Sequence, residues 1–213
     1  MLPWILLTVV ALAAVLWIER YSEHRYIWIA KPLASTGFIG AAVANDAFLT
    51  PYGRMVFIAL VWSMLGDILL IKRDSRAAFL MGLVAFLIGH IGFAVAFSVR
   101  GVEPTWMWAS MAGLALVMWV VLRWLWPHVP AAMKIPVLAY IVVITVMVAM
   151  AFGTHGVAPH GVLLTGAILF YLSDLTVARQ RFVTKAYANR LVGLPLYYAG
   201  QLLFAWSITE PVL

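Results

Sequence analysis

The stretch Gly161–Ala178 reads GVLLTGAILFYLSDLTVA, and its residues include a single charged side chain, that of Asp174. The hydrocarbon core of a bilayer is crossed by about 20 apolar residues in helical conformation. A run of this length and polarity therefore predicts a transmembrane helix. A carboxylate is costly to insert into such a helix, so its presence indicates a specific role inside the molecule.

The composition of the whole chain agrees with that prediction. Its 213 residues are 65% hydrophobic and 10% charged, with a mean hydropathy of +1.02, which excludes an ordinary soluble domain. We expect an all-α fold, a polytopic membrane helix bundle of eight transmembrane helices. Short polar clusters separate the predicted spans, which lie at residues 2–18, 28–45, 54–71, 78–98, 105–125, 134–152, 159–178 and 190–208.

The positively charged residues are distributed unevenly between the connections. Of the 14 Lys and Arg residues, Arg54 and Arg100 flank even-numbered connections and all the others, Arg73 among them, flank odd-numbered ones. By the positive-inside rule, the odd connections are cytoplasmic and both termini lie outside. We expect an integral multi-pass protein of a bacterial inner membrane. Topology and anionic lipid account for the net charge of +6, so we expect no nucleic-acid partner.

Several classes of reactive site are absent from the sequence. The chain contains no cysteine, which excludes a disulfide framework, a thiolate nucleophile and a cysteine-based metal site. Its five histidines show no ligand spacing such as His-x-x-x-His, so we expect neither a metal nor a cofactor. No Gly-x-Ser-x-Gly elbow surrounds Ser63 or Ser173, which argues against a serine hydrolase.

The chain aligns with itself. Residues 82–94, GLVAFLIGHIGFA, match residues 193–205, GLPLYYAGQLLFA, without a gap, and both glycines coincide. The similarity predicts one transmembrane domain over residues 1–213, made of two parallel four-helix repeats at about 1–103 and 104–213. Such halves are related by an axis along the membrane normal.

The same alignment pairs Asp67 with Asp174 and Lys31 with Lys134. An ionisable residue inside a span costs roughly 2.5–3.5 kcal/mol on insertion scales and marks a functional interior by default. We therefore expect the two aspartates to meet between the halves, near the cytoplasmic ends of their helices. The alternative is a structural role, in which each aspartate is held by a cation of its own loop. Lys31 either pairs with a carboxylate or binds a lipid phosphate, whereas Lys134 marks the membrane surface.

Further polar residues are candidates for the wall of a binding site. His90 lies midway along its span, where it either relays a proton or locks helices together, and its counterpart in the repeat is Gln201. Several tyrosines have hydroxyl groups that either donate to a ligand or take part in packing. The predicted substrate-binding residues are Lys31, His90, Ser63, Ser173, Tyr197, Tyr198 and Gln201.

These residues fall in an order that resembles a known family. The motifs are Lys31-Pro-Leu, Ser63-x-x-Gly-Asp67-Ile-Leu-Leu, Phe79-x-x-Gly-Leu-x-x-Phe-x-x-Gly-His90, Leu172-Ser-Asp174 and Tyr197-Tyr-x-x-Gln201-Leu-Leu. From about residue 31 to 208 the chain is similar to the YhhN-like lysoplasmalogenase family. The resemblance implies a membrane hydrolase that cleaves the vinyl ether of lysoplasmalogens, releasing a fatty aldehyde and glycerophosphoethanolamine or glycerophosphocholine. The polar positions of the family carry over as Lys31, Asp67, His90, Asp174 and Gln201.

Vinyl ethers hydrolyse by protonation on carbon. Two carboxyl groups in one desolvated pocket suit this chemistry, because one keeps its proton while the other is ionised. We therefore predict Asp67 and Asp174 as the catalytic acid and base, with their roles unassigned. Lys31 and nearby arginines would hold the phosphate of a lysophospholipid that enters sideways from the membrane lipids. Two alternatives remain, a small-solute or proton-coupled transporter and a non-catalytic lipid-binding scaffold.

Overall fold

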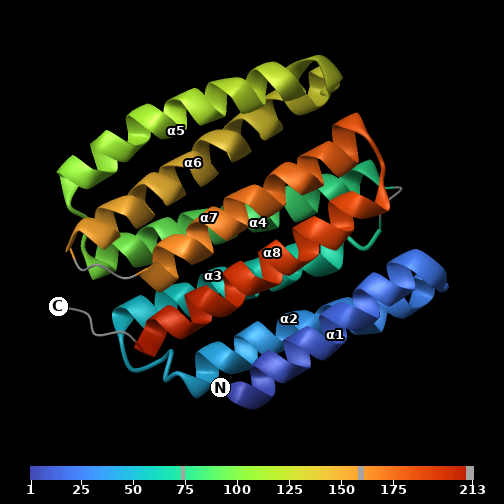
Figure 1. Cartoon of the computed structure of the whole chain (residues 1–213), viewed down its shortest axis with the longest axis horizontal. Helices are drawn as coiled ribbons and strands as arrows, with labels where there is room; N and C mark the ends of the chain where they lie inside the picture. The colour runs from blue at the N-terminus through green and yellow to red at the C-terminus, as the bar shows by residue number, and fades with distance from the viewer. Residues whose placement is uncertain (73–74, 158–160, 210–213) are drawn as a thin grey trace.

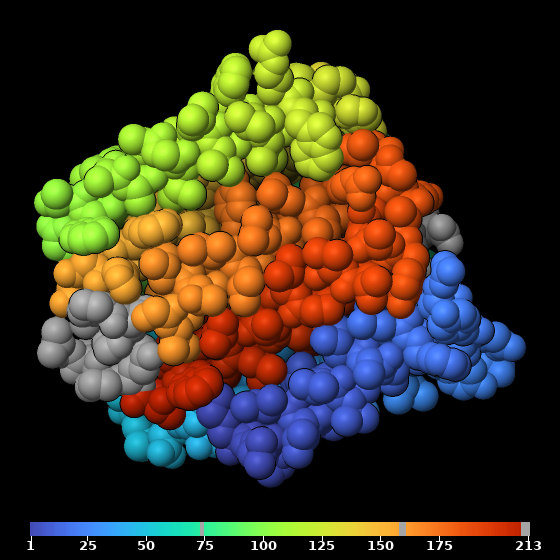
Figure 2. Space-filling model, viewed as in Figure 1, coloured from blue at the N-terminus to red at the C-terminus, as the bar shows by residue number. Residues whose placement is uncertain are grey.

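A computed structural model describes residues 1–72, 75–157 and 161–209. Over these residues the protein has eight long helices, each long and apolar enough to span a membrane, and no strand. The predicted all-α membrane bundle is confirmed, and the helices run side by side along one direction (Figure 1), with their side chains packed against one another (Figure 2). Their bounds are α1 Leu2–Tyr21, α2 Ile27–Ala44, α3 Pro51–Leu69, α4 Arg76–Arg100, α5 Pro104–Leu125, α6 Lys134–Val157, α7 Gly161–Ala178 and α8 Tyr187–Trp206.

The helix ends differ from the predicted spans by a few residues, because caps rather than hydropathy set them. The Thr50 hydroxyl accepts the backbone N–H of Gly53 at 2.9 Å and Pro51 occupies the first turn, so α3 begins three residues before the predicted span. The Ser75 hydroxyl likewise accepts from Ala78 N at 3.1 Å at the start of α4. Arg73, His160 and the predicted start of the seventh span at Pro159 lie outside the described residues.

The helices pack in two sets of four with the same order of contacts. In the first set α1 packs on α2 and α3 on α4, and in the second set α5 packs on α6 and α7 on α8. Between the sets α4 packs on α6 and α8 on α2. This reciprocal pattern is the one that a two-fold repeat requires, and the duplication itself stays a prediction from the sequence.

The interface between the two sets is aromatic and closely packed. Phe93 and Phe204 have ring centroids 4.1 Å apart, and Phe170 lies edge-on to both at 6.2 and 6.4 Å. Where α7 crosses α8, a Cβ on Gly200 would lie 3.0 Å from the carbonyl oxygen of Gly166, so only glycine allows this approach without a shift. The aromatic rings therefore join the two sets in the middle of the bundle, and the glycine contact packs α7 closely on α8 within the second set.

The four odd-numbered connections meet at one end of the bundle, here called the basic end, and the N-terminus lies at the other (Figure 1). Asp67 lies two residues before the end of α3, and Asp174 lies four residues before the end of α7. Both helices reach the basic end there, so the fold brings the two acidic side chains to the same end of the molecule.

Candidate active site

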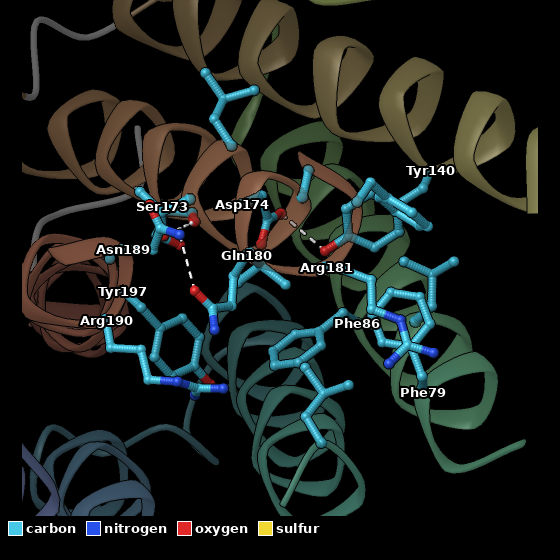
Figure 3. Close-up of a pocket in the computed structure, with 18 of the residues that line it drawn as sticks. Phe79, Phe86, Tyr140, Ser173, Asp174, Gln180, Arg181, Asn189, Arg190 and Tyr197 are labelled. Carbon is cyan, nitrogen blue, oxygen red and sulfur yellow. Dashed lines mark hydrogen bonds between the residues drawn. The ribbon is translucent and has the colours of Figure 1, made fainter. Parts of the chain in front are cut away.

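A cavity of about 300 Å³ opens at the basic end between the two helix sets. Its walls are mainly apolar, and Figure 3 shows the rings of Phe86 and Tyr197 facing the same space as the Asp174 carboxyl group. Six helices contribute the side chains that define the site: Lys31 from α2, Asp67 from α3, Phe86 from α4, Tyr140 from α6, Asp174 from α7 and Tyr197 from α8. The two aspartates thus share one cavity.

Asp67 is buried and has polar partners on both carboxyl oxygens. Its Oδ1 lies 3.1 Å from the Lys31 Nζ, and its Oδ2 accepts hydrogen bonds from the hydroxyl groups of Ser35 and Tyr197, both at 2.7 Å. Both carboxyl oxygens of Asp67 are therefore occupied by partners within the protein, a cation on one and two hydroxyl donors on the other.

Lys31 is also fully occupied. Its ammonium group binds the Asp67 carboxylate and donates to the Asp67 carbonyl oxygen at 3.0 Å, and the residue is 7% exposed. Of the two roles that the sequence left open for Lys31, the structure displays the pairing with a carboxylate. Its partner is Asp67, at the same end of the neighbouring helix.

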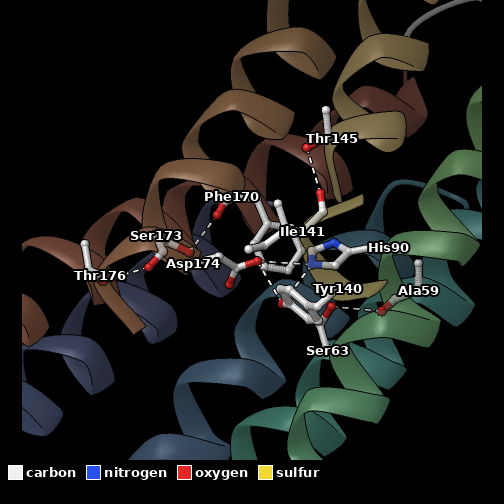
Figure 4. Close-up of polar contacts among 10 residues, drawn as sticks. All are labelled: Ala59, Ser63, His90, Tyr140, Ile141, Thr145, Phe170, Ser173, Asp174 and Thr176. Carbon is white, nitrogen blue, oxygen red and sulfur yellow. Dashed lines mark hydrogen bonds and ion pairs between the residues drawn. The ribbon is translucent and has the colours of Figure 1, made fainter. Parts of the chain in front are cut away.

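Asp174 has a different environment. Its Oδ2 accepts a hydrogen bond from the Tyr140 hydroxyl at 2.8 Å and lies 3.1 Å from His90 Nε2 (Figure 4). Among the described residues no cation other than the imidazole pairs with it, and its side chain is 15% exposed. The second oxygen, Oδ1, has no hydrogen-bond partner in the described part of the chain and is left for the cavity.

The hydrogen bonds around His90 indicate its tautomer. The ring is fully buried, Nε2 lies within reach of Asp174 and of the Tyr140 hydroxyl at 2.9 Å, and Nδ1 is buried without a partner among the described residues. A neutral ring with the proton on Nε2 donates to Asp174 and leaves only a lone pair on Nδ1.

The remaining predicted residues fall into two groups, those that line the cavity and those that do not. Ser173 lines the cavity, and its hydroxyl donates to the Phe170 carbonyl oxygen at 2.9 Å. The structure places the others between packed helices, behind the wall and without contact with the cavity, so they are positioned to support the site rather than to touch a ligand. This second group comprises Ser63, His90, Tyr198 and Gln201.

Two polar residues of the site were not among the predicted ones. Ser35 lies four residues after Lys31, on the same face of α2, and this spacing is a signal that the sequence did contain. Tyr140 was one of several tyrosines with an open role, and nothing in its surroundings in the sequence distinguishes it. Only the packing of α6 against α4 and α7 brings its hydroxyl to Asp174 and His90.

The mouth of the cavity is polar. A short π-helix, Arg179–Val183, follows α7 and contributes Gln180 and Arg181 to the lining. Figure 3 shows Arg181 and Arg190 on opposite sides of the opening. The cavity therefore combines apolar walls with two carboxyl groups and with cations near its opening, a combination that suits an amphipathic ligand.

The comparisons with known proteins identify the family of the chain. The model of the YhhN family matches residues 26–208. The chain belongs to the YhhN family. The resemblance seen in the sequence is thereby confirmed, and no solved structure matches this YhhN protein at a significant level.

Several relatives of this YhhN protein carry a functional name. Lysoplasmalogenase TMEM86A of Bos taurus is 31% identical over 168 residues, which cover 75% of this chain and 67% of the relative. Lysoplasmalogenase TMEM86B of Mus musculus is 32% identical over 150 residues, 70% of this chain and 61% of the relative. A lysoplasmalogenase of Mycobacterium tuberculosis is 29% identical over 164 residues, 74% of this chain and 61% of the relative.

Proposed function

We propose that this YhhN protein is a lysoplasmalogenase that hydrolyses the vinyl ether of a lysoplasmalogen within the membrane. The observation that carries the proposal is the carboxyl group of Asp174, which has one oxygen bonded to Tyr140 and His90 and the other left for an apolar cavity. The names of the relatives support the same activity. The products would be a fatty aldehyde and glycerophosphoethanolamine or glycerophosphocholine.

Asp174 is the proton donor in this proposal. Because Oδ2 accepts from Tyr140 and His90, the carboxyl proton resides on Oδ1, toward the substrate. Transfer of that proton to the alkenyl carbon that is not bonded to oxygen uses the electron pair of the double bond. The result is an oxocarbenium ion on the other carbon and a carboxylate on Asp174.

The Asp174 carboxylate then acts as the base. A water molecule adds to the oxocarbenium carbon and gives its proton to Asp174, which restores the acid and leaves a hemiacetal. The hemiacetal collapses: its C–O bond to glycerol breaks, the glycerol oxygen takes up a proton and the hydroxyl group loses one. The same division of roles, acid first and base second, applies to one carboxyl group in retaining glycosidases.

Asp67 stabilises the cationic intermediate indirectly. Its charge is balanced by Lys31 at 3.1 Å, so its net field in the cavity is weak. The hydrogen bond from Tyr197 to Asp67 holds the Tyr197 ring in the cavity wall, edge-on to Phe86 with centroids 5.8 Å apart. The faces of aromatic rings attract cations, so the two rings are suited to an oxocarbenium ion.

The apolar wall of the cavity would accommodate the alkenyl chain of the substrate. Leu83 of α4, Val121 and Leu125 of α5 and Ile141 of α6 line the cavity, and α5 is otherwise turned outward, with only Val121 and Leu125 buried. The alkenyl chain would lie along these side chains and enter from the lipid beside α5. The vinyl ether, which lies just below the headgroup in a bilayer, would then reach the depth of Asp174.

The test is an aldehyde assay in deuterated water. Purified protein should release fatty aldehyde from a 1-alkenyl lysolipid and none from its 1-acyl counterpart, and borohydride trapping with mass spectrometry should find one deuterium on the carbon next to the aldehyde. Aldehyde without that deuterium would exclude protonation on carbon. Absence of aldehyde, combined with proton-coupled solute uptake in proteoliposomes, would favour the transporter instead.

A further inference from the structure

We propose that Lys72 and Lys185 form a subsite for the phosphate of the lipid headgroup at the mouth of the cavity. The inference rests on the proposed function for the identity of the lipid, but it concerns binding and not the hydrolytic step. Both residues line the cavity, Lys72 from the connection between α3 and α4 and Lys185 from the connection between α7 and α8.

The charges on the described cavity wall are unbalanced in favour of an anion. Its acidic members are Asp67 and Asp174, whereas its cationic members are Lys31, Lys72, Arg181, Lys185 and Arg190. An excess of positive charge that surrounds a concave opening concentrates anionic ligands there. A phosphodiester is the anionic group that every glycerophospholipid carries.

Three of the five cations are already engaged inside the protein. Lys31 is paired with Asp67 at 3.1 Å. The guanidinium of Arg181 lies over the Phe79 ring at 4.4 Å, and Arg190 Nε lies 3.4 Å from a Glu19 carboxylate oxygen. Lys31 is therefore not the residue that receives a phosphate, although the sequence left that role open to it.

Lys72 and Lys185 are the exposed cations of the wall, and neither ammonium group has an ion pair or hydrogen bond in the described part of the chain. An ammonium group in this state loses no internal partner when it binds a phosphate. Between them they approach the opening from both helix sets, so a bound phosphate would bridge the two halves.

The backbone that carries Lys185 is held in place. Asn189, which is 4% exposed, accepts a hydrogen bond from Arg179 and donates to the Thr184 carbonyl oxygen at 2.7 Å and to Gln180 Oε1 at 2.8 Å. These bonds close the segment between α7 and α8 into a compact turn. A positioned turn reduces the ordering cost of binding at its lysine.

The subsite also fits the geometry of the substrate. The three carbons of glycerol separate the phosphate from the vinyl ether oxygen, so a phosphate held at the rim leaves the vinyl ether one glycerol length further in. The Asp174 carboxyl group lines the cavity on that inner side, and the apolar wall extends beyond it. The headgroup, the vinyl ether and the alkenyl chain would thus each contact a part of the cavity wall whose polarity matches their own.

The experiment measures binding without catalysis. A saturated 1-alkyl lysophosphatidylethanolamine, which has no vinyl ether, and 1-alkylglycerol, which has no phosphate, are titrated against purified protein in neutral detergent. Tryptophan fluorescence gives the Kd values. The phosphate-bearing lipid should bind the native protein about tenfold more tightly or better, and K72Q/K185Q should lose most of that preference, with each single variant losing about three- to tenfold.

Lys134 provides the matched control. It lies at the same basic end, but its ammonium group is over the Trp126 ring at 4.8 Å and it does not line the cavity. K134Q should keep the native preference, and K72R/K185R should restore it. The proposal is overturned if K72Q/K185Q still prefers the phosphate-bearing lipid, or if K134Q loses as much of the preference. Neither measurement depends on aldehyde release, so a failure of the proposed reaction would be seen separately.

Discussion

Asp67 and Asp174 occupy corresponding places in the two helix sets, yet their surroundings differ. Asp67 is bound on both oxygens by an ammonium group and two hydroxyl groups. Asp174 is bound on one oxygen by a hydroxyl group and an imidazole. The difference means that only Asp174 has an oxygen left for a ligand, so under the proposed function the neighbours, and not the aspartates themselves, would set the two roles.

The neighbours differ because α2 and α6 carry different residues at the basic end. On α2, Lys31 and Ser35 both reach Asp67. On α6, the corresponding Lys134 is turned to Trp126, and Tyr140 supplies the contact to Asp174 instead. Each aspartate is also contacted by a helix of the other set, Asp67 by Tyr197 of α8 and Asp174 by His90 of α4.

Replacement of Asp174 by Asn should have the largest effect on catalysis. The amide cannot donate a proton to carbon, so aldehyde release should fall by about 10²–10⁴-fold, the usual contribution of a general acid. The thermal midpoint of unfolding should change little, because Tyr140 and His90 can still donate to the amide oxygen. Native activity in this variant would show that Asp174 is not the proton donor.

Replacement of Asp67 by Asn should act mainly on stability. It leaves the Lys31 ammonium buried without its counter-charge, a defect that costs about 3–5 kcal/mol in the free energy of unfolding. The double variant K31M/D67N removes both charges and should recover much of the midpoint in thermal unfolding of the detergent-purified protein. Should D67N be as stable as the native protein but inactive, Asp67 would be a direct catalyst and the two aspartates would be more alike than their contacts suggest.

The two tyrosines allow a matched pair of smaller changes. Y140F removes one of two donors to Asp174 Oδ2 and should lower kcat about 10- to 100-fold, the worth of a hydrogen bond to a charged group. Y197F should lower kcat about three- to tenfold, because Asp67 retains Lys31 and Ser35. Equal effects of both changes on kcat would remove the distinction between the two sites.

The smallest effect is expected at Glu103, an exposed acid that caps α5 outside the spans. Hydrogen bonds from the backbone N–H groups of Trp106 and Thr105 lower its pKa. A lowered folded-state pKa means that the charged form adds stability above the unfolded-state pKa, and that this stability is lost as the pH falls through the folded-state pKa. Glu103→Gln should therefore slightly reduce the thermal midpoint at pH 7, with no difference in strong acid and no change in aldehyde release.

Much of the fold was predictable because each span is a long apolar run bounded by charges. The repeat pointed to Asp67 and Asp174, since acids are rare in such runs and their order repeats. The pairing of Lys31 with Asp67 was one of two stated possibilities, and only the three-dimensional structure could choose, because the partner lies on another helix. His90 and Gln201 were predicted to bind the ligand, but the rotation of their helices places both in the packed interior. A polar residue in a predicted span does not show which way its helix is rotated.

The position of the cavity at one end of the bundle has a consequence for the release of the products. In the proposed reaction the soluble headgroup would be released at the charged opening into the aqueous phase, whereas the long-chain aldehyde would leave between the helices into the bilayer. The two products would therefore depart by different routes, and neither would block the exit of the other.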